Sequence, residues 1–447
     1  MSPAGDRSRG SGTPLSSGHA AGALQAAAQH RTPFYLTDLA QLDAAAAALE
    51  AAFPDPWLRA YSLKADPGVA TVARLRARGW AANCVSLGEV AAARRAGAGN
   101  GDITLEGIGK GDDELRAAVA TAKQGDPLRW IAVESLDETR ALVSCAEEAG
   151  LHDDAPLPVL LRFNPGVEPG TIDALAVGRG SSKFGMDISE ALESARELAG
   201  APGLQLLGIH LHVGSQLRDL RAWRDAVARA ASAYRTLADA GLLHEATIGG
   251  SRDEGRGTLC VGGGMPVSLP GDPTSETPEQ VARAFRRAVD AALEEAARLG
   301  AVPTRLAIEP GRALVAAATI LVARVLHVRP RVEVTADGTR CTRQVILDAG
   351  MTELIRPALY GARHPVVALR GGAPIASLVH GPICESTDAL GAHDLPDSLS
   401  RGDLVAILGA GAYADAMWSP YNGRPRPARL SVARDGSISV DREREPA

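Results

Sequence analysis

The sequence predicts an α/β protein built from a (β/α)₈ barrel followed by a mostly β domain. Three observations support this prediction. At 447 residues the chain is too long for one ordinary domain. From about Trp57 to Glu309, short apolar runs alternate with Ala-rich amphipathic stretches, the pattern of a parallel sheet covered by helices. After Gly311 the pattern changes to short apolar runs separated by Gly, Pro and Asp turns, which favours β structure.

The first part of the chain contains eight candidate strands. They are Arg59–Leu63, Ala82–Val85, Ile103–Leu105, Trp130–Val133, Val159–Arg162, Leu206–His212, Thr258–Val261 and Arg305–Ile308. Eight strand–helix units over about 250 residues suit a closed barrel better than an open doubly wound sheet. In such barrels the chemistry gathers at the C-terminal ends of the strands, so functional side chains are expected there.

The second part of the chain is predicted to be a β domain. Its candidate strands are Ile320–Val328, Arg331–Val334, Gln344–Asp348, Pro365–Leu369, Ile375–His380, Leu404–Leu408 and Arg429–Val432. One more strand, Thr32–Asp38, precedes the barrel and is predicted to join this β domain. The expected plan is a disordered lead over 1–30, a joining strand and helix over 31–56, a barrel over 57–314 and a β domain over 315–447. Gly249–Gly257 (GGSRDEGRG) is predicted to be an exposed polar loop.

Composition narrows the class of protein. Apolar residues make up 45% of the chain and charged residues 22%, the balance of a soluble globular protein, and a net charge of -6 gives no sign of nucleic-acid binding. The five cysteines are odd in number and form no CxxC, which argues against disulfides or a zinc site and favours a reducing cytoplasm. No apolar run reaches the roughly 18 residues of a membrane span. The Gly-, Ser- and Ala-rich N-terminus lacks the apolar core of a signal peptide.

Lys64 stands at the end of the first predicted barrel strand, in Tyr61-Ser-Leu-Lys-Ala-Asp-Pro67. A lysine there is expected to point into the barrel mouth. Schiff-base lysines work where neighbouring groups expose a neutral amine. A lone lysine at such a position is more often a solvated surface residue, so the surrounding motifs decide between the two interpretations.

Three other strand ends carry groups that suit one cofactor. His212 and Ser215 follow a predicted strand, where an imidazole can stack on an aromatic ring and a hydroxyl can bond a phosphate. Gly262–Gly264 follows the next strand, and glycines let backbone N–H groups close around an anion. Glu309 and Arg312 follow the last strand. A carboxylate facing a pyridine nitrogen keeps it protonated, which pyridoxal phosphate (PLP) chemistry requires.

These strand ends belong to a larger set of motifs. They are YSLKA (61–65), VSLGEV (85–90), GIGKGDDEL (107–115), LRFNPG (161–166), SSKFGMD (181–187), HVGSQ (212–216), GGG (262–264), EPGR (309–312), IRPALYGARH (355–364), GPICESTD (381–388) and GAYADAMWSPYN (411–422). With this set the chain, from about Pro33 to Tyr421, resembles the fold-type III PLP decarboxylases. This family contains the diaminopimelate, ornithine and arginine decarboxylases and has a barrel similar to that of alanine racemase.

The resemblance implies a role for each of the residues singled out at the strand ends. Lys64 would hold PLP as a Schiff base, His212 would stack on its ring, and Glu309 would pair with the pyridine nitrogen. The phosphate would be held by Ser215, Gly263, Gly264, the backbone around Gly311, and Tyr413.

The resemblance also implies a homodimer with shared active sites. Cys384 and Glu385 would enter the site from the partner subunit, Cys384 as the proton donor after carbon dioxide leaves and Glu385 as a contact for the distal end of the substrate. Arg312, Arg356 and Tyr360 would clamp a distal carboxylate, since Arg binds carboxylates bidentately. The IRPALY motif is more similar to diaminopimelate decarboxylase than to ornithine decarboxylase.

Several positions depart from the diaminopimelate decarboxylase pattern. The usual KAN is Lys64-Ala-Asp66, Asn83 replaces an acidic residue, and Thr171–Gly178 and Met265–Ser268 differ from the family segments. The substrate therefore stays open between diaminopimelate and a modified amino acid of secondary metabolism. Two further functions are compatible with the same barrel, that of an amino-acid racemase and that of a non-catalytic relative. The CESTD element argues against a racemase, and the presence of Lys64 argues against a non-catalytic protein.

Overall fold

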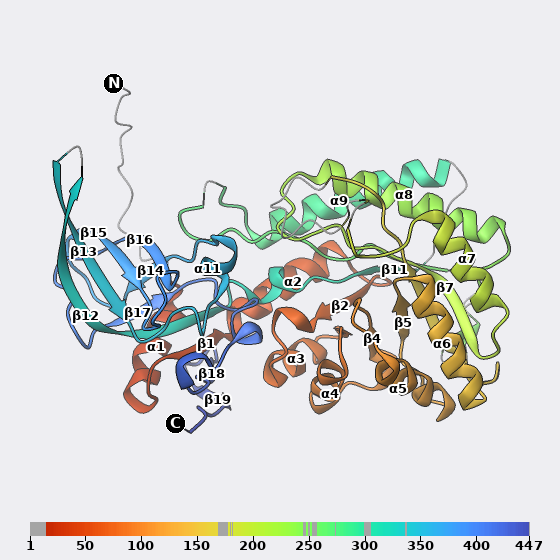
Figure 1. Cartoon of the computed structure of the whole chain (residues 1–447), viewed down its shortest axis with the longest axis horizontal. Helices are drawn as coiled ribbons and strands as arrows, with labels where there is room; N and C mark the ends of the chain where they lie inside the picture. Colours follow the sequence, from red (N-terminus) through yellow and green to blue (C-terminus); the bar gives the residue numbers. More distant parts are fainter. Residues whose placement is uncertain are drawn as a thin grey trace.

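A computed structural model of the chain shows two domains side by side, a barrel surrounded by helices and a β domain (Figure 1). The structure describes residues 15–168, 178, 180, 182–244, 247–248, 251–252, 257–272, 274–298, 305–335 and 338–446. Eight parallel strands close the barrel in the order β2-β3-β4-β5-β6-β7-β10-β11, so the predicted fold class is confirmed. The strands are β2 (Leu58–Ser62), β3 (Ala81–Cys84), β4 (Ile103–Leu105), β5 (Trp130–Val133), β6 (Leu157–Arg162), β7 (Leu204–His210), β10 (Thr258–Cys260) and β11 (Arg305–Ile308).

Helices cover the outside of the barrel. They are α3 (Val69–Arg76), α4 (Leu87–Arg95), α5 (Asp112–Lys123), α6 (Leu136–Ala149), α7 (Ile188–Ala199), α8 (Leu220–Asp239) and α9 (Pro278–Arg298). Several begin at a side-chain cap, because Ser86, Ser135 and Asp187 each accept a backbone N–H three residues later. Trp130, Leu160 and other apolar side chains fill the barrel interior. The helix caps and the packed interior together fix where each strand ends, and therefore where the residue after it points.

The β domain is a mixed sheet that includes the first strand of the chain. β1 (Phe34–Asp38) pairs antiparallel with β12 (Thr319–Thr335) and parallel with β18 (Ala428–Val432). The other strands are β13 (Gly338–Leu347), β14 (Val366–Ala368), β15 (Pro374–His380), β16 (Ala389–Pro396), β17 (Leu404–Ile407) and β19 (Ile438–Arg442). The helices α2 (Leu39–Ala52) and α10 (Arg312–Val315) lie on the two connections to the barrel, and α11 (Arg356–Tyr360) follows β13.

The N-terminal lead differs from the sequence-based expectation of disorder. Helix α1 covers Ser17–Gln29, and Ser16 caps it by accepting the N–H of His19. Its buried residues Ala23 and Ala26 join an apolar cluster with strands of the β domain. Composition suggested disorder, but alanine is the best helix former and this helix gains a surface to pack on. Residues 1–14 lie outside the described residues.

Two further points complete the fold. The predicted loop Gly249–Gly257 falls partly outside the described residues; of it, β9 (Ser251–Arg252) pairs with β8 (Thr247–Ile248). Within the described part of the chain, no helix has the length and apolarity needed to cross a membrane.

Candidate active site

A cavity of about 400 Å³ lies where the C-terminal ends of the barrel strands face the β domain. This volume is typical of a small-molecule site. Its barrel residues are Lys64, Val85, Glu106, Gly107, Ile108, Gly109, Arg162, Phe184, His210, His212, Gly214, Ser215, Glu309 and Arg312, and its β-domain residues are Arg356, Tyr360, Tyr413 and Met417. The cavity therefore needs both domains.

Lys64 lies on the wall of this cavity, in a single 3-10 turn (Leu63–Ala65) that directly follows β2. Leu63 and Ala65 are buried, so the turn packs against the core on both sides of the lysine. The N–H of Tyr413 donates to the carbonyl of Ala65 at 2.8 Å, which ties this turn to the β domain. One backbone hydrogen bond thus joins the turn that carries Lys64 to the cavity residue Tyr413 of the β domain.

His212 lies just after β7 with a defined tautomer. The N–H of Gly263 donates to Nδ1 of His212 at 3.3 Å, so Nδ1 is an acceptor and the ring proton is on Nε2. Burial and the charges of Lys64 and Arg162 lower the pKa of His212 well below its usual value. The ring is therefore neutral, and its planar face can stack on an aromatic ring.

The glycine run beside His212 is required by close backbone contacts. A Cβ at Gly263 would lie 2.3 Å from the carbonyl oxygen of Glu309, and a Cβ at Gly264, where φ is +96°, would lie 2.4 Å from that of Gly214. No other residue type fits at these distances. The run packs directly against the residues after β7 and β11.

Glu309 lines the cavity and accepts hydrogen bonds on both oxygens. His210 Nε2 lies 3.0 Å from Oε2, and the Cys260 thiol donates to Oε1 at 3.0 Å. A second carboxyl group, Glu106, lies 3.2 Å from the same nitrogen of His210 and accepts from the indole of Trp130. His210, Cys260 and Glu309 also bring their potential ligand atoms within 4.8 Å of one another, but hydrogen bonds already join these atoms.

The two carboxyl groups differ in protonation. Burial and the nearby charge of Glu309 raise the pKa of Glu106 to about 7. Burial also acts to raise the pKa of Glu309, but the charge of His210 and the hydrogen bonds from His210, Glu106 and Cys260 lower it overall. The group with more donors stays ionised. Glu309 therefore presents a fixed negative charge to the cavity, while Glu106 can hold a proton near neutral pH.

Arg312 and Ser215 form the side of the cavity nearest Tyr413. Arg312 donates to the Ser215 hydroxyl from Nε and Nη2, both at 3.2 Å, and its guanidinium lies 4.8 Å from the centre of the Tyr413 ring. The hydroxyl, the guanidinium and the phenol are groups that bind phosphate or carboxylate oxygens.

Arg356 and Tyr360 lie on α11, on the β-domain side of the cavity. The Arg356 guanidinium lies 5.9 Å from the centre of the Tyr360 ring. Its Nε is buried and has no hydrogen-bond partner among the described residues. Burial and the charge of Arg312 lower the pKa of Arg356 to about 10. Two buried guanidiniums close enough to repel each other, one of them lacking a partner, define a position for an anionic group.

Five sequence-predicted residues do not line the cavity of this chain. Gly263 and Gly264 lie behind it, and Gly311 lies against Ser62 and Ala65 next to the Lys64 turn. Cys384 and Glu385 lie elsewhere on the β domain and are exposed. The N–H of Cys384 bonds Oδ1 of Asn422 at 3.4 Å, and the Tyr421 hydroxyl donates to Glu385 at 2.6 Å.

Sequence reasoning missed three charged cavity residues, Glu106, Arg162 and His210. Arg162 pairs with the buried Glu134 at 2.6 Å and lies over the ring of Phe184. Glu106 directly follows β4, while Arg162 and His210 are the last residues of β6 and β7. The expectation that chemistry gathers at strand ends would have found them, because it applies to every barrel strand rather than to those with familiar motifs.

The residues present fit PLP. The cavity offers an amine, a neutral imidazole, a fixed carboxylate, and a group of hydroxyl and guanidinium donors, which match the aldehyde, ring face, pyridine nitrogen and phosphate of this cofactor. The fold and the site together define a PLP-binding barrel protein.

Comparison with known proteins agrees with this class. Residues 39–316 match the family described as pyridoxal-dependent decarboxylase, pyridoxal binding domain. The diaminopimelate decarboxylase of Aquifex aeolicus is 32% identical over 93% of this chain and 89% of its own length, and that of Deinococcus radiodurans is 35% identical over 91% and 92%. The crystal structure of diaminopimelate decarboxylase from Helicobacter pylori complexed with L-lysine has a TM-score of 0.80 and 29% identity, and the match covers 95% of this chain and 96% of that one.

The chain belongs to the pyridoxal-dependent decarboxylase family. It is a PLP-dependent amino-acid decarboxylase, as the resemblance of its motifs implied.

Proposed function

We propose that the substrate carries a carboxylate or a second amino acid group at its distal end, and that meso-diaminopimelate is the first candidate. The observation that carries this proposal is the buried Nε of Arg356, which lacks a partner among the described residues and lies beside a second guanidinium, that of Arg312. A distal carboxylate would supply the missing acceptor and relieve the repulsion. The relatives named as diaminopimelate decarboxylases support the same choice.

In this proposal, different residues of the chain have different roles in one reaction. Bound PLP supplies the electron sink that lets the bond between Cα and the carboxylate break. Lys64 holds the cofactor, His212 orients its ring and Glu309 keeps the pyridine nitrogen protonated. Ser215, Tyr413 and the backbone of Gly263, Gly264 and Gly311 hold the phosphate. Carbon dioxide leaves, and a proton is added at Cα in its place.

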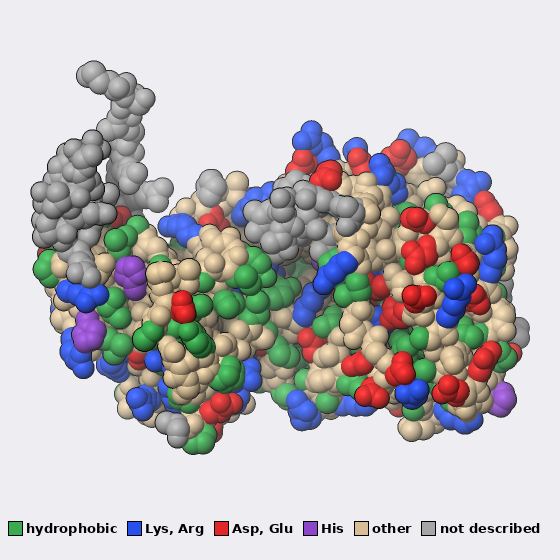
Figure 2. All heavy atoms as spheres, viewed as in Figure 1, with side chains coloured by type: hydrophobic (Ala, Val, Ile, Leu, Met, Phe, Trp, Pro, Cys, Tyr) green, Lys and Arg blue, Asp and Glu red, His purple; other side chains and the backbone are tan. Residues whose placement is uncertain are grey.

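The proton donor is proposed to come from a second copy of the chain. Cys384 and Glu385 are exposed and do not line the cavity of their own chain. In the view of Figure 2, hydrophobic side chains gather along the junction between the β domain and the barrel. Leu359, beside the cavity residue Tyr360, is 52% exposed, and the cavity residue Ile108 is 42% exposed. An apolar rim of this kind suits a homodimer in which each Cys384 and Glu385 enters the cavity of the partner.

We also propose a cytoplasmic location. The cysteines whose side chains the structure describes, Cys84, Cys145, Cys260 and Cys384, are free. Free thiols suit a reducing compartment.

The experiment that tests the substrate is carbon dioxide release from purified, PLP-loaded protein. The panel holds meso-diaminopimelate, L-lysine, L-ornithine, L-arginine and L-glutamate. Release from diaminopimelate alone is the expected result. Carbon dioxide release from L-lysine or L-ornithine at the same rate as from diaminopimelate would contradict the distal clamp. If no member of the panel releases carbon dioxide, the substrate would instead be a modified amino acid. The Lys64→Ala protein is the control and should be inactive on every member.

The shared site is tested by mixing two inactive proteins. Lys64→Ala lacks the cofactor lysine, and Cys384→Ala lacks the proposed proton donor. If the sites are shared, subunit exchange creates one cavity with both residues intact, and activity returns on mixing. Mixing without recovery, although mass analysis shows mixed dimers, would show that Cys384 does not act in the cavity of the partner.

A further inference from the structure

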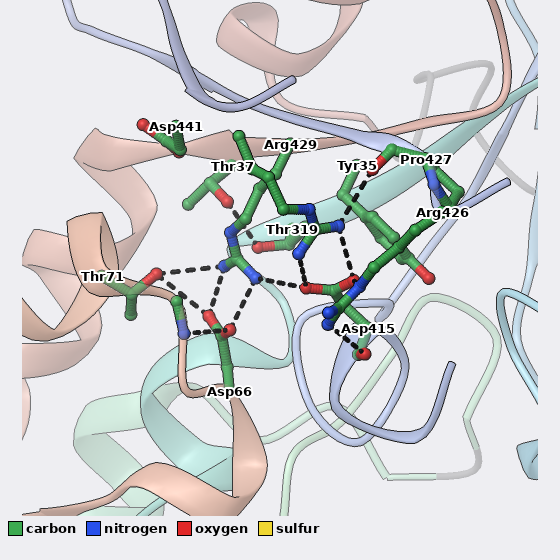
Figure 3. A network of polar contacts seen from close by, with 12 residues as sticks. Tyr35, Thr37, Asp66, Thr71, Thr319, Asp415, Arg426, Pro427, Arg429 and Asp441 are labelled. Atoms are coloured by element: carbon green, nitrogen blue, oxygen red, sulfur yellow. Dashed lines mark hydrogen bonds and ion pairs between the residues drawn. The ribbon is translucent and has the colours of Figure 1, made fainter. Parts of the chain in front are cut away.

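A buried network of ion pairs joins the barrel to the β domain beneath the Lys64 turn (Figure 3). We call it the interdomain network. It consists of Asp66, Asp415, Arg426, Arg429 and Arg442. Two carboxylates therefore form direct ion pairs with three guanidiniums.

Arg429 is the member that crosses between the domains. It lies on β18, and its Nη1 and Nη2 donate to the two oxygens of Asp66 in the barrel. The two side chains are 4% and 3% exposed, so water hardly screens this pair. Nη2 also donates to the Thr71 hydroxyl at 3.0 Å, and Nη1 lies 3.5 Å from Asp415.

Asp66 ends the turn that carries Lys64. Its carbonyl accepts from the buried Tyr61 hydroxyl at 2.8 Å, and its side chain accepts from the Gly68 N–H and the Thr71 hydroxyl, both at 3.0 Å. Since only Ala65 lies between Lys64 and Asp66, a shift of this carboxylate moves the base of the lysine.

Asp415 ends the loop that carries Tyr413. Arg442 binds both of its side-chain oxygens at 2.7 Å, and Arg426 binds one at 3.1 Å. Asp415 opens the 3-10 turn that contains the cavity residue Met417. Arg429 therefore binds one carboxylate in each of two segments, Asp66 beside Lys64 and Asp415 beside Tyr413. These two segments meet at the hydrogen bond between Tyr413 and Ala65.

Gly68 leaves room for the guanidinium of Arg429. A Cβ at Gly68 would lie 2.9 Å from Cζ of Arg429. Any larger residue at position 68 would push Arg429 away from Asp66. Gly68 and Arg429, 361 positions apart in the sequence, therefore depend on each other.

The charges that Asp415 and Arg429 bring to the network are fixed over the working pH range. Burial acts to raise the pKa of Asp415, but its hydrogen bond to Arg442 and the charges of Arg429, Arg442 and Arg426 lower it to about 2. Burial acts to lower the pKa of Arg429, but Asp66 and Asp415 raise it overall. Both groups are therefore charged at neutral pH.

We propose that Arg429 is a positioning residue for the reaction, which sets Lys64 through Asp66 and Tyr413 through Asp415. This inference rests on the proposed role of Lys64 as the cofactor lysine. By this inference the β domain has two separate roles: it lines part of the cavity, and it holds the cofactor lysine in position.

The test compares Arg429→Met with Arg442→Met in the full chain. Both remove one guanidinium from Asp415, but only the first removes the partner of Asp66. Three readouts are used: the dissociation constant for PLP, the visible absorbance of the lysine-bound cofactor, and amide exchange in residues 61–67. We expect Arg429→Met to bind PLP about 10- to 100-fold more weakly, because a small displacement of a reacting group costs this much. Its 61–67 segment should exchange faster, whereas Arg442→Met, which leaves Asp66 paired with Arg429, should match the wild type in the exchange of this segment and lose less PLP affinity.

Two further variants make the result decisive. Asp66→Asn/Arg429→Met removes both charges together, which avoids an unpaired buried charge if the single variant fails to fold. Arg429→Lys should recover part of the PLP affinity. A folded Arg429→Met or double variant that matches Arg442→Met in PLP affinity and in exchange of residues 61–67 would overturn the inference. If Lys64→Ala itself keeps the lysine-bound absorbance, the proposed role of Lys64 fails instead.

Discussion

Two buried clusters of charge in this molecule use the same residue types in opposite ways. In the interdomain network, every carboxylate and every guanidinium takes part in a direct ion pair. In the cavity, Arg312 and Arg356 repel each other, and the Nε of Arg356 has no hydrogen-bond partner among the described residues. The pKa values follow this difference, since that of Asp415 falls to about 2 while that of Glu106 rises to about 7.

The comparison teaches how to separate structural from functional charge in a buried site. A buried charge without a counter-charge is costly, so an anionic ligand that supplies the counter-charge is favoured in the cavity. In the network every guanidinium is already paired with a carboxylate, although the Nε atoms of Arg429 and Arg442 have no hydrogen-bond partner among the described residues. By the criterion of charge pairing, the cavity is a binding site and the network is scaffold, although both are buried and both join the two domains.

The largest effect is expected for Glu309→Gln in the cavity. The amide keeps the size of the side chain but loses the negative charge at the proposed position of the pyridine nitrogen. We expect kcat to fall by on the order of 100-fold or more, as for other groups that stabilise developing charge. Steady-state kinetics and the absorbance of the bound cofactor measure this effect. A kcat close to that of the wild type would mean that Glu309 is structural.

In the network, Asp415→Asn is expected to lower stability. Breaking a buried ion pair from one side costs about 3 kcal/mol of unfolding free energy. Because the folded pKa of Asp415 lies below its usual value of 3.8, its contribution is present above pH 4 and is lost as pH falls toward 2. Urea unfolding at pH 7 and at low pH tests both statements. The matched control is the exposed Asp435→Asn, which should leave the midpoint unchanged; an equal shift in both proteins would contradict the prediction.

Arg356→Ala tests the unpartnered guanidinium. Losing a charge-assisted hydrogen bond costs about 1.5–3 kcal/mol, so KM for a substrate with a distal carboxylate should rise about 10- to 100-fold. For L-lysine, which lacks that carboxylate, kcat/KM should change little. Equal losses on both substrates would show that Arg356 shapes the cavity rather than binding the distal carboxylate.

Glu106→Gln is expected to have the smallest effect, visible mainly through pH. The folded pKa of Glu106, about 7, lies above its usual 4.5, so this group stabilises the fold at low pH and loses that contribution as pH rises through 7. Glutamine does not titrate, so the variant should gain stability relative to the wild type between pH 5 and 8, by roughly 1–3 kcal/mol. Parallel pH–stability curves would show that Glu106 does not titrate in this range.

Much of the fold could be predicted from the sequence because barrel strands are short, continuous apolar runs. Ile103–Leu105, Trp130–Val133 and Arg305–Ile308 have the predicted bounds, and the bounds of the other barrel strands differ from the prediction by at most two residues. Two strands of the β domain were missed. β16 (ALGAHDLP) and β19 (ISVDR) carry polar and exposed residues, so they lack the apolar pattern that marked the others.

The site was partly predictable for a different reason. Lys64, His212 and Glu309 follow strands within recognisable motifs. The roles of Glu106 and His210, in contrast, depend on contacts with residues far away in the sequence. The pairing of Asp66 with Arg429 links positions 363 residues apart, and no local pattern indicates it. Sequence position shows which side chains reach the cavity mouth, but it cannot show which of them remain unpaired.

The place of β1 has a consequence for how the chain is made. Its residues are synthesised before the barrel, yet its neighbours β12 and β18 are synthesised only after it. The edges of β1 therefore stay unpaired until the whole barrel has been made, and an exposed edge is a site of aggregation. A nascent chain stalled before Ala428 would already contain every barrel strand but would lack β18, the parallel partner of β1.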